Sequence, residues 1–151
     1  MRLTARADYA VRAAAELAAV APDSMKVEAI AEAQGIPPRF LENILVSLRR
    51  AGLAQSRRGA DGGYRLARPP SRISVADVIR AADGPLANVQ GVRPEDVSYE
   101  GNAASLQEVW IAVRASLRSV LEEVTLEDVA GGHLPDVVHQ LAERPEAWEA
   151  H

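Results

Sequence analysis

Polar side chains that can recognise other molecules gather between residues 39 and 59, and arginine dominates among them. A guanidinium group pairs with phosphate oxygens through parallel hydrogen bonds. An asparagine amide can pair with adenine, and a glutamate can accept a hydrogen bond from cytosine. The polar candidates are Arg39, Glu42, Asn43, Arg49, Arg50, Arg57 and Arg58. Their chemistry suits contact with the bases and phosphates of double-stranded DNA.

Other kinds of chemistry find little support in the sequence. The chain has no cysteine, which excludes disulfides, thiolate catalysis, zinc ribbons and clusters held by thiolates. The acidic pairs at 122–123 and 127–128 are typical of a solvated helix end, and His133 and His139 do not share one helical face. No P-loop, GxSxG motif or Ser-His-Asp order occurs. We therefore expect no enzyme, no metal site and no cofactor.

The formal net charge of −4 hides a division between the two halves of the chain. Residues 1–72 hold 12 basic and 7 acidic side chains, a net charge of +5, whereas residues 73–151 hold 5 basic and 14 acidic ones, a net charge of −9. A basic half on an acidic chain predicts a polyanion that meets one end of the molecule. The alternative is ordinary scatter of charge.

Length and hydropathy indicate a soluble protein. The 151 residues suit one domain, or a small domain with an appendage. No apolar run approaches the ~20 residues of a membrane-spanning helix. Charged residues at 6, 8, 12 and 16 interrupt the apolar stretch that a signal peptide requires. We expect a cytoplasmic protein with no membrane partner.

The spacing of apolar residues in the first half predicts three helices and a hairpin. The first helix spans 5–20, the second spans 26–34 and ends at Gly35, and the third opens at two prolines and spans 38–50. The third helix is amphipathic, with an inward face of Leu41, Ile44, Leu45 and Leu48. Short extended runs at 53–58 and 64–68 then flank a glycine-rich turn, which is typical of a β-hairpin. A further helix over 75–83 follows Ser74 as its N-cap.

The second half contains a loop and then the strongest helical pattern in the chain. Residues 85–102 show no period, and a loop of that length is usually functional or poorly ordered. Eight apolar residues then recur at helical spacing over about five turns. They are Leu106, Val109, Trp110, Val113, Leu117, Val120, Leu121 and Val124. Beyond them, Thr125 is predicted to cap a short helix. Residues 133–151 are predicted to form a weak helix followed by a frayed tail.

The apolar stripe of the long helix predicts self-association, because it is wider than one small domain needs. We expect a homodimer whose interface contains the stripe residues from Leu106 to Leu121. The alternative is that the helix folds back on its own domain in a monomer.

The order of these elements is that of a winged helix-turn-helix, a fold that is mainly α with a small β-hairpin wing. The major groove of DNA, about 12 Å wide, admits one helix, whose polar side chains contact base edges. The predicted organisation is a DNA-binding domain at 1–83, a sensor-type loop at 84–102, a dimerisation region at 103–131 and a tail at 132–151.

The chain resembles the IscR/NsrR/CymR, or Rrf2, family of bacterial transcriptional regulators. The resemblance rests on MRLTARADYAVRAAAELA, on IAEAQGIPPRFLENILVSLRRAGLAQSRRGADGGYRLARPPSRISVADVIRAADGPL and on VWIAVRASLRSVLEEVTLEDV, in the family's order. It implies a homodimer of winged-helix domains whose long helices cross. It also implies that the loop before that helix is where relatives often hold an iron–sulfur cluster through three cysteines.

Carried over by position, the resemblance assigns 38–50 as the recognition helix. Arg39, Phe40, Glu42 and Asn43 match groove-contacting positions, and Arg49 matches a phosphate contact. Arg58 matches a wing arginine that enters the minor groove, and the wing turn contains Gly59, Gly62 and Gly63. Pro37 and Pro38 replace the serine often found there, so one phosphate contact is missing. Alternatives from the residues themselves are a core position for Phe40, an ion pair of Glu42 with Arg39 or Arg49, and a solvated Asn43.

The sensor-type loop departs from the family because it contains no cysteine, which excludes a thiolate-held cluster. Asp8, where some relatives place an acidic ligand, reads instead as an i,i+4 partner of Arg12. The loop residues Arg93, Glu95, Asp96 and Tyr99 could line a small-molecule effector pocket or dock a partner enzyme. A regulator without an effector is the third possibility.

Family members without a cluster that control sulfur metabolism make cysteine or sulfur assimilation the leading hypothesis for the regulated genes. The function predicted is a sequence-specific, homodimeric repressor. The alternative is an interaction or sensing module that kept the fold without binding DNA by itself.

Overall fold

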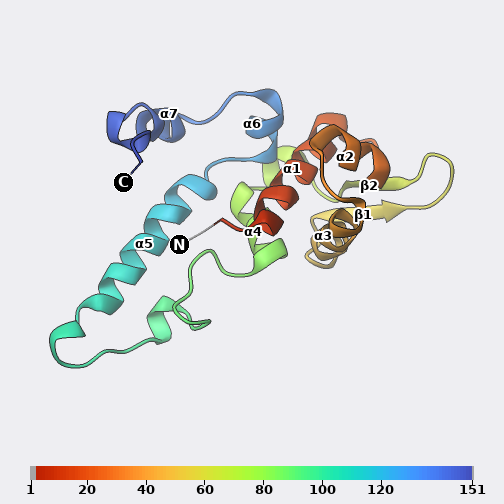
Figure 1. Ribbon diagram of the computed structural model, residues 1–151. Helices are drawn as coiled ribbons and strands as arrows, with labels where there is room; N and C mark the ends of the chain where they lie inside the picture. The colour runs from red at the N-terminus through yellow and green to blue at the C-terminus, as the bar shows by residue number, and fades with distance from the viewer. Residues whose placement is uncertain (1–2, 151) are drawn as a thin grey trace.

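The computed structural model describes residues 3–150, and none of its helices is long and apolar enough to cross a membrane. The elements are α1 (Ala5–Val20), α2 (Val27–Gln34), α3 (Pro38–Arg50), β1 (Ala54–Arg57), β2 (Gly63–Leu66), α4 (Val75–Asp83), α5 (Leu106–Leu121), α6 (Leu126–Gly131) and α7 (Asp136–Ala142). Short 3-10 turns lie at Pro70–Arg72, Pro94–Asp96, Gly101–Ala103 and Pro145–Ala147. Helices α1–α4 and the hairpin form one unit, from which α5 extends as an arm (Figure 1). The predicted fold class, mainly helical with a two-stranded wing, is confirmed.

Helix boundaries follow from local capping chemistry. The Thr4 hydroxyl accepts a hydrogen bond from the Ala7 N–H at 3.0 Å, which satisfies one of the unpaired donors at the start of α1. Ser74 and Asp77 form a reciprocal capping box at the start of α4. Gly35 ends α2 in the left-handed conformation with φ 62°, which a glycine adopts without steric cost.

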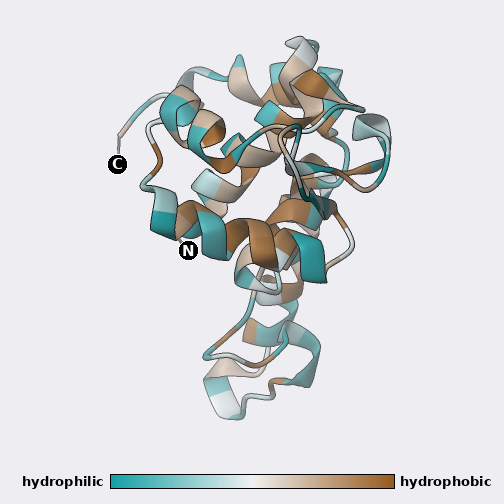
Figure 2. Ribbon diagram, turned by 90° about the vertical axis from the view of Figure 1, so that its right-hand side faces the viewer, coloured by the Kyte–Doolittle hydropathy of each residue, from teal (hydrophilic) through white to brown (hydrophobic). Residues whose placement is uncertain are grey.

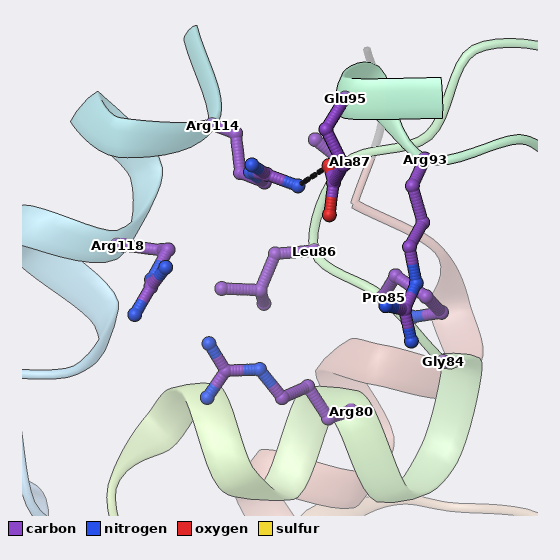
Figure 3. Close-up of a pocket in the computed structure, with 9 residues that line it drawn as sticks. All are labelled: Arg80, Gly84, Pro85, Leu86, Ala87, Arg93, Glu95, Arg114 and Arg118. Atoms are coloured by element: carbon purple, nitrogen blue, oxygen red, sulfur yellow. Dashed lines mark hydrogen bonds and ion pairs between the residues drawn. The ribbon is translucent and has the colours of Figure 1, made fainter. Parts of the chain in front are cut away.

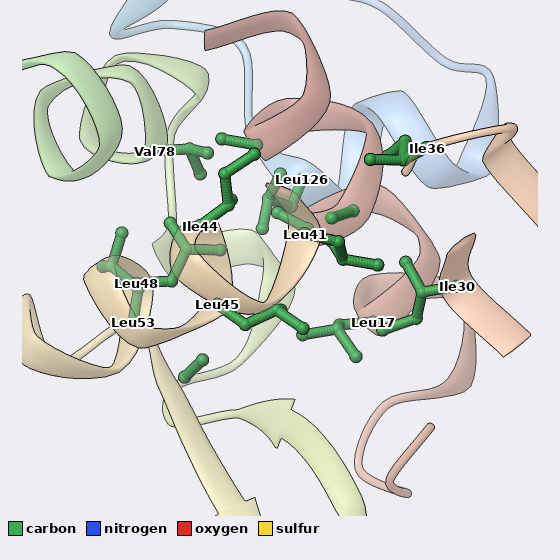
Figure 4. Close-up of a cluster of buried hydrophobic side chains, with 14 of the residues drawn as sticks. Leu17, Ile30, Ile36, Leu41, Ile44, Leu45, Leu48, Leu53, Val78 and Leu126 are labelled. Carbon is green, nitrogen blue, oxygen red and sulfur yellow. The ribbon is translucent and has the colours of Figure 1, made fainter. Parts of the chain in front are cut away.

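The core lies between α1, α3 and the elements that flank them. Small residues on α1 (Ala10, Ala13 and Ala14) are buried and let neighbouring helices approach closely. The larger side chains are contributed by Leu17, Ile30, Leu41, Ile44, Leu45 and Leu48, all fully buried (Figure 4). Since the buried face of α3 is the predicted one, its polar face is left on the outside.

The wing pairs β1 with β2 in antiparallel register, from Ala54 opposite Leu66 to Arg57 opposite Gly63. A third segment joins it, because the Met25 and Tyr64 backbones exchange hydrogen bonds of 2.8 and 2.9 Å. This contact explains a glycine requirement. A Cβ atom at Gly63 would lie 2.2 Å from the Met25 carbonyl oxygen, and φ there is +131°.

Helix α6 packs onto the unit formed by α1–α4 and the hairpin rather than extending the arm. Leu126 is fully buried in the main core, and its N–H donates to the Ile73 carbonyl at 2.9 Å. The Val75 N–H donates to the Val124 carbonyl at 2.8 Å. The predicted region 103–131 therefore divides in the structure, with α5 in the arm and α6 against α1. The predicted helix running to Val124 ends at Leu121, and the tail contains the short helix α7.

Candidate nucleic-acid interface

The outer face of α3 presents the polar side chains that the sequence singled out. Arg39, Glu42, Asn43, Arg49 and Arg50 are all exposed. Figure 2 views the molecule from the side of the hairpin, and hydrophilic and hydrophobic residues alternate along this helix. The arrangement leaves the polar face free to enter a groove while the apolar face anchors the helix.

Phe40 lies at the edge of the core rather than inside it. Its ring meets Tyr9 edge to face, with centroids 5.6 Å apart, and 41% of the residue is exposed. The Arg12 guanidinium lies 5.3 Å from the centroid of the same Tyr9 ring, a cation–π distance. Phe40 thus retains surface that could contact a sugar or a base while it is held by α1.

Glu42 and Asn43 differ in how they are held. Within residues 3–150, the structure shows no ion pair between Glu42 and either Arg39 or Arg49. The Asn43 side-chain amide donates to the Arg39 carbonyl at 3.3 Å, a weak bond within the helix. Both side chains keep their acceptor oxygens available on the exposed face.

Arg6 is a positioning residue that sequence reasoning missed. Its Nε donates to the Ala82 carbonyl at 2.8 Å, and its Nη2 donates to the Ser47 hydroxyl at 2.7 Å. The Ser47 hydroxyl donates in turn to the Asn43 carbonyl at 3.2 Å. One guanidinium therefore ties the end of α4 to the middle of α3. The residues next to Arg6 in the sequence do not indicate that its side chain links α4 to α3.

The hairpin is tied to α3 by a contact near the end of that helix. The Arg49 guanidinium donates to the Ser56 hydroxyl at 3.3 Å. Across the strands, Arg65 donates twice to the Gln55 side-chain oxygen, at 3.0 and 3.2 Å. Beyond these contacts, Arg57, Arg58 and Gly59 are exposed. The basic tip and the α3 face consequently lie on one side of the molecule (Figure 2).

The apolar stripe on α5 is only partly covered. No residue of this helix is buried: Val109 is 49% exposed, and the other stripe residues between Leu106 and Leu121 are half-buried. An apolar groove of about 760 Å³ runs between α5, α4 and the start of α1. Its apolar lining includes Leu3, Ala7, Ile79, Leu86, Leu117, Val120 and Leu121.

The loop before α5 is held against that helix at several points. The Gln107 amide donates to the Glu95 and Val97 carbonyls at 3.0 and 2.6 Å, and the Trp110 indole donates to the Tyr99 hydroxyl at 3.1 Å. Glu95 forms an ion pair with Arg114. A hydrogen bond from its own backbone N–H, together with the Arg114 guanidinium, holds the pKa of the Glu95 carboxyl below its usual value. Asp96 is exposed, whereas Tyr99 is half-buried.

Asp8 pairs with Arg12 at 3.1 Å, the i,i+4 contact that the sequence predicted. Across residues 3–150, no group of three histidine, aspartate or glutamate side chains is placed to hold a metal ion. With no cysteine anywhere in the chain, the donors that an iron–sulfur cluster needs are missing.

Comparison with known proteins covers almost the whole chain. Residues 3–132 match the Rrf2 family model, described as iron-dependent transcriptional regulators. A helix-turn-helix transcriptional regulator of Mycobacterium tuberculosis is 53% identical over 151 residues, with 99% of this chain and 94% of the relative covered. The Bacillus subtilis regulator CymR is 34% identical over 133 residues, with 86% and 90% covered.

Solved structures give the same picture. The structure of CymR, the global cysteine regulator of B. subtilis, superposes with a TM-score of 0.74 at 31% identity, covering 87% of this chain and 98% of CymR. IscR from T. potens gives a TM-score of 0.69 at 31% identity, covering 100% and 93%. The iron dependence in the family's description does not fit the residues of this chain, which offers neither thiolates nor a metal-holding cluster within 3–150.

Proposed function

The chain belongs to the Rrf2 family of DNA-binding transcriptional regulators, which are not enzymes, and on this premise we propose that it is a homodimeric repressor of a near-palindromic operator. One observation carries the proposal. The polar face of α3 and the arginine-bearing hairpin lie on one side of the molecule and are linked by the hydrogen bond from Arg49 to Ser56. That geometry suits a helix in the major groove with a wing reaching the neighbouring minor groove.

In this arrangement the residues divide into two kinds of contact. Arg39, Glu42 and Asn43 face the base edges, with Phe40 beside them, and so contribute sequence preference. Arg49 and Arg50 at the end of α3 meet phosphates and fix the register. Arg57 and Arg58 enter or flank the minor groove, where Gly59 lets the backbone approach closely.

Dimerisation through α5 is supported by its apolar face, which is only partly covered in the single chain. A second copy that lays its own α5 against this groove would bury the Val109 and Leu117 surfaces of both chains. A twofold pair of winged domains then places two recognition helices about 34 Å apart, one turn of DNA. Repression follows if the operator overlaps a promoter.

For the regulated genes we propose cysteine or sulfur assimilation. The support is the similarity to CymR, the global cysteine regulator of B. subtilis, together with the absence of cysteine from this chain. Regulation would then depend on a small molecule or a partner enzyme that meets the loop of Arg93, Glu95, Asp96 and Tyr99, and not on a cluster.

The experiment measures binding of the purified chain to the DNA upstream of its own gene by fluorescence anisotropy over a salt series. We expect tight, sequence-specific binding whose affinity falls steeply with salt, because phosphate neutralisation releases counterions. Arg58→Ala should weaken binding and make the salt slope shallower, whereas Arg144→Ala, an exposed arginine in the tail, should leave both unchanged. Salt-independent binding, or none, would favour an interaction module that retained only the fold.

A further inference from the structure

Four arginines from three segments line one cavity outside the DNA-contacting face. The cavity has a volume of about 450 Å³ and lies between α4, the following loop and α5. Arg80 enters from α4, Arg93 from the loop, and Arg114 and Arg118 from α5. Figure 3 shows the four guanidinium groups arranged around Leu86. We call this the arginine cavity.

The carboxylates around the arginine cavity do not balance these charges. Glu95 pairs with Arg114, and Glu122 accepts hydrogen bonds from both Arg80 and Arg118. These two guanidinium groups hold the pKa of the Glu122 carboxyl below its usual value, so it is ionised and already shared. Asp77 approaches Arg80 only at 3.9 Å.

Within residues 3–150, Arg93 forms no ion pair closer than 4 Å, and its guanidinium makes no hydrogen bond, although its charge contributes to the lowered pKa of Glu95. Like charges held close together in a partly enclosed space repel, and an anion placed among them relieves that repulsion. Arg114 is only 24% exposed, so its interactions are less screened than those of a free surface arginine.

From this geometry we infer that the arginine cavity binds a small organic molecule that contains two or more acidic groups. Guanidinium groups bind carboxylate and phosphate oxygens through a planar pair of donors, and several forks around one space suit several acidic groups on one ligand. A volume of about 450 Å³ is typical of small-ligand sites. Pro85, Leu86 and Ala87 supply an apolar wall for the carbon skeleton.

The cavity is also linked to the DNA-contacting face. Arg80 lies on α4, whose Ala82 carbonyl accepts from Arg6, and Arg6 also holds Ser47 on α3. A ligand that draws Arg80 toward Arg114 changes how α4 sits against α5, and Arg6 passes that change to the recognition helix. This regulatory consequence rests on the proposed function, whereas ligand binding itself does not.

The test is isothermal titration calorimetry of the full chain, without DNA, using citrate and pyrophosphate at constant ionic strength. Citrate probes polycarboxylates and pyrophosphate probes phosphoryl compounds. We expect one saturable site per chain for at least one probe. Arg93→Gln should weaken that binding at least tenfold, and within residues 3–150 it removes no ion pair.

Glu95→Gln should change the affinity for the anion in the opposite direction to Arg93→Gln. This difference distinguishes a binding site from a cluster of arginines with only a structural role. It removes the carboxylate that competes for Arg114, and we expect it to tighten binding of the anion severalfold. Arg144→Gln, which changes an exposed arginine in the tail, is the matched control and should leave anion binding unchanged.

Three results would overturn the inference: no saturable binding of either probe, equal weakening by Arg144→Gln, or no gain from Glu95→Gln. Anisotropy with operator DNA is measured separately on the same proteins. Failure of DNA binding alone contradicts the proposed function, and failure of anion binding alone contradicts the arginine cavity.

Discussion

Arg6 in α1 and Ser47 in α3 are 41 residues apart in the chain, yet the Arg6 guanidinium donates a 2.7 Å hydrogen bond to the Ser47 hydroxyl. The same guanidinium holds the Ala82 carbonyl at the end of α4 at 2.8 Å. Helix α3 is thus oriented by a polar contact on its side as well as by the apolar residues beneath it.

Removing the Arg6 contact should lower both stability and DNA affinity. Hydrogen bonds that involve a charged group contribute about 1.5–3 kcal/mol each, so the loss of both Arg6 bonds in Arg6→Ala should reduce the free energy of unfolding by about 3 kcal/mol or more. Urea unfolding measures this change. Arg50→Ala is the comparison, because Arg50 is exposed on α3 and should lower DNA affinity without changing stability. A double-mutant cycle of Arg6→Ala and Ser47→Ala that gives no coupling energy would contradict the assignment.

Substitution at Gly63 should damage the wing more than substitution at Gly59. Both have positive φ, at +131° and +103°, so an alanine at either costs about 1–3 kcal/mol in backbone strain. Only at Gly63 does the added Cβ also meet the Met25 carbonyl, whereas space around Gly59 is open. We expect Gly63→Ala to unfold at lower urea than Gly59→Ala and to bind DNA more weakly. Equal urea midpoints for the two variants would show that the backbone at Met25 moves away from the added Cβ without loss of stability.

Local patterns were enough to predict α1, α3, α4 and the hairpin. Their apolar spacing and capping residues act within a few positions of one another, as Ser74 does with Asp77. The inward face of α3 was likewise predicted from its spacing, and its residues are buried. The polar outer face then follows, although which of its side chains contact DNA remains a prediction.

Long-range contacts could not be predicted in the same way. The packing of Leu126 into the main core depends on the loop that brings α6 back to α1, and no spacing within 125–131 indicates it. The hydrogen bonds of Arg6 and the convergence of Arg80, Arg93 and Arg114 join segments that are tens of residues apart. In the sequence alone, each of these arginines is indistinguishable from a solvated surface charge, because only the fold brings it close to its partners.

A charge on the exposed stripe of α5 should prevent self-association. Val109 is 49% exposed in the single chain, so Val109→Asp adds a charge without filling or emptying the core. In a dimer formed through α5 the same carboxylate would be buried against apolar groups, which is strongly unfavourable. Light scattering should give the mass of two chains for the wild type and of one chain for Val109→Asp.

The matched control for this test is Ala115→Asp, on the opposite, exposed side of α5. Its mass should remain that of two chains, because the new charge stays in water. If Ala115→Asp dissociates the protein as well, the interface involves a different face of the helix. If Val109→Asp stays dimeric, the apolar stripe is not the interface.

Acid should weaken the attachment of α6 through Asp128. The Thr125 hydroxyl and backbone N–H donate to the Asp128 carboxylate at 2.7 and 2.8 Å and hold the pKa of this carboxyl below its usual value. A carboxyl whose pKa is lowered by folding stabilises the fold above its unfolded pKa of about 3.9, and loses that effect as the pH falls through its folded pKa. Asp128→Ala should therefore lower the melting temperature at pH 7 and lower it much less near pH 3. The comparison is Asp136→Ala, an exposed acid in α7, which should show no such pH-dependent difference. A loss for Asp128→Ala that is the same at both pH values would mean that the capping geometry, and not the charge of the carboxylate, stabilises α6.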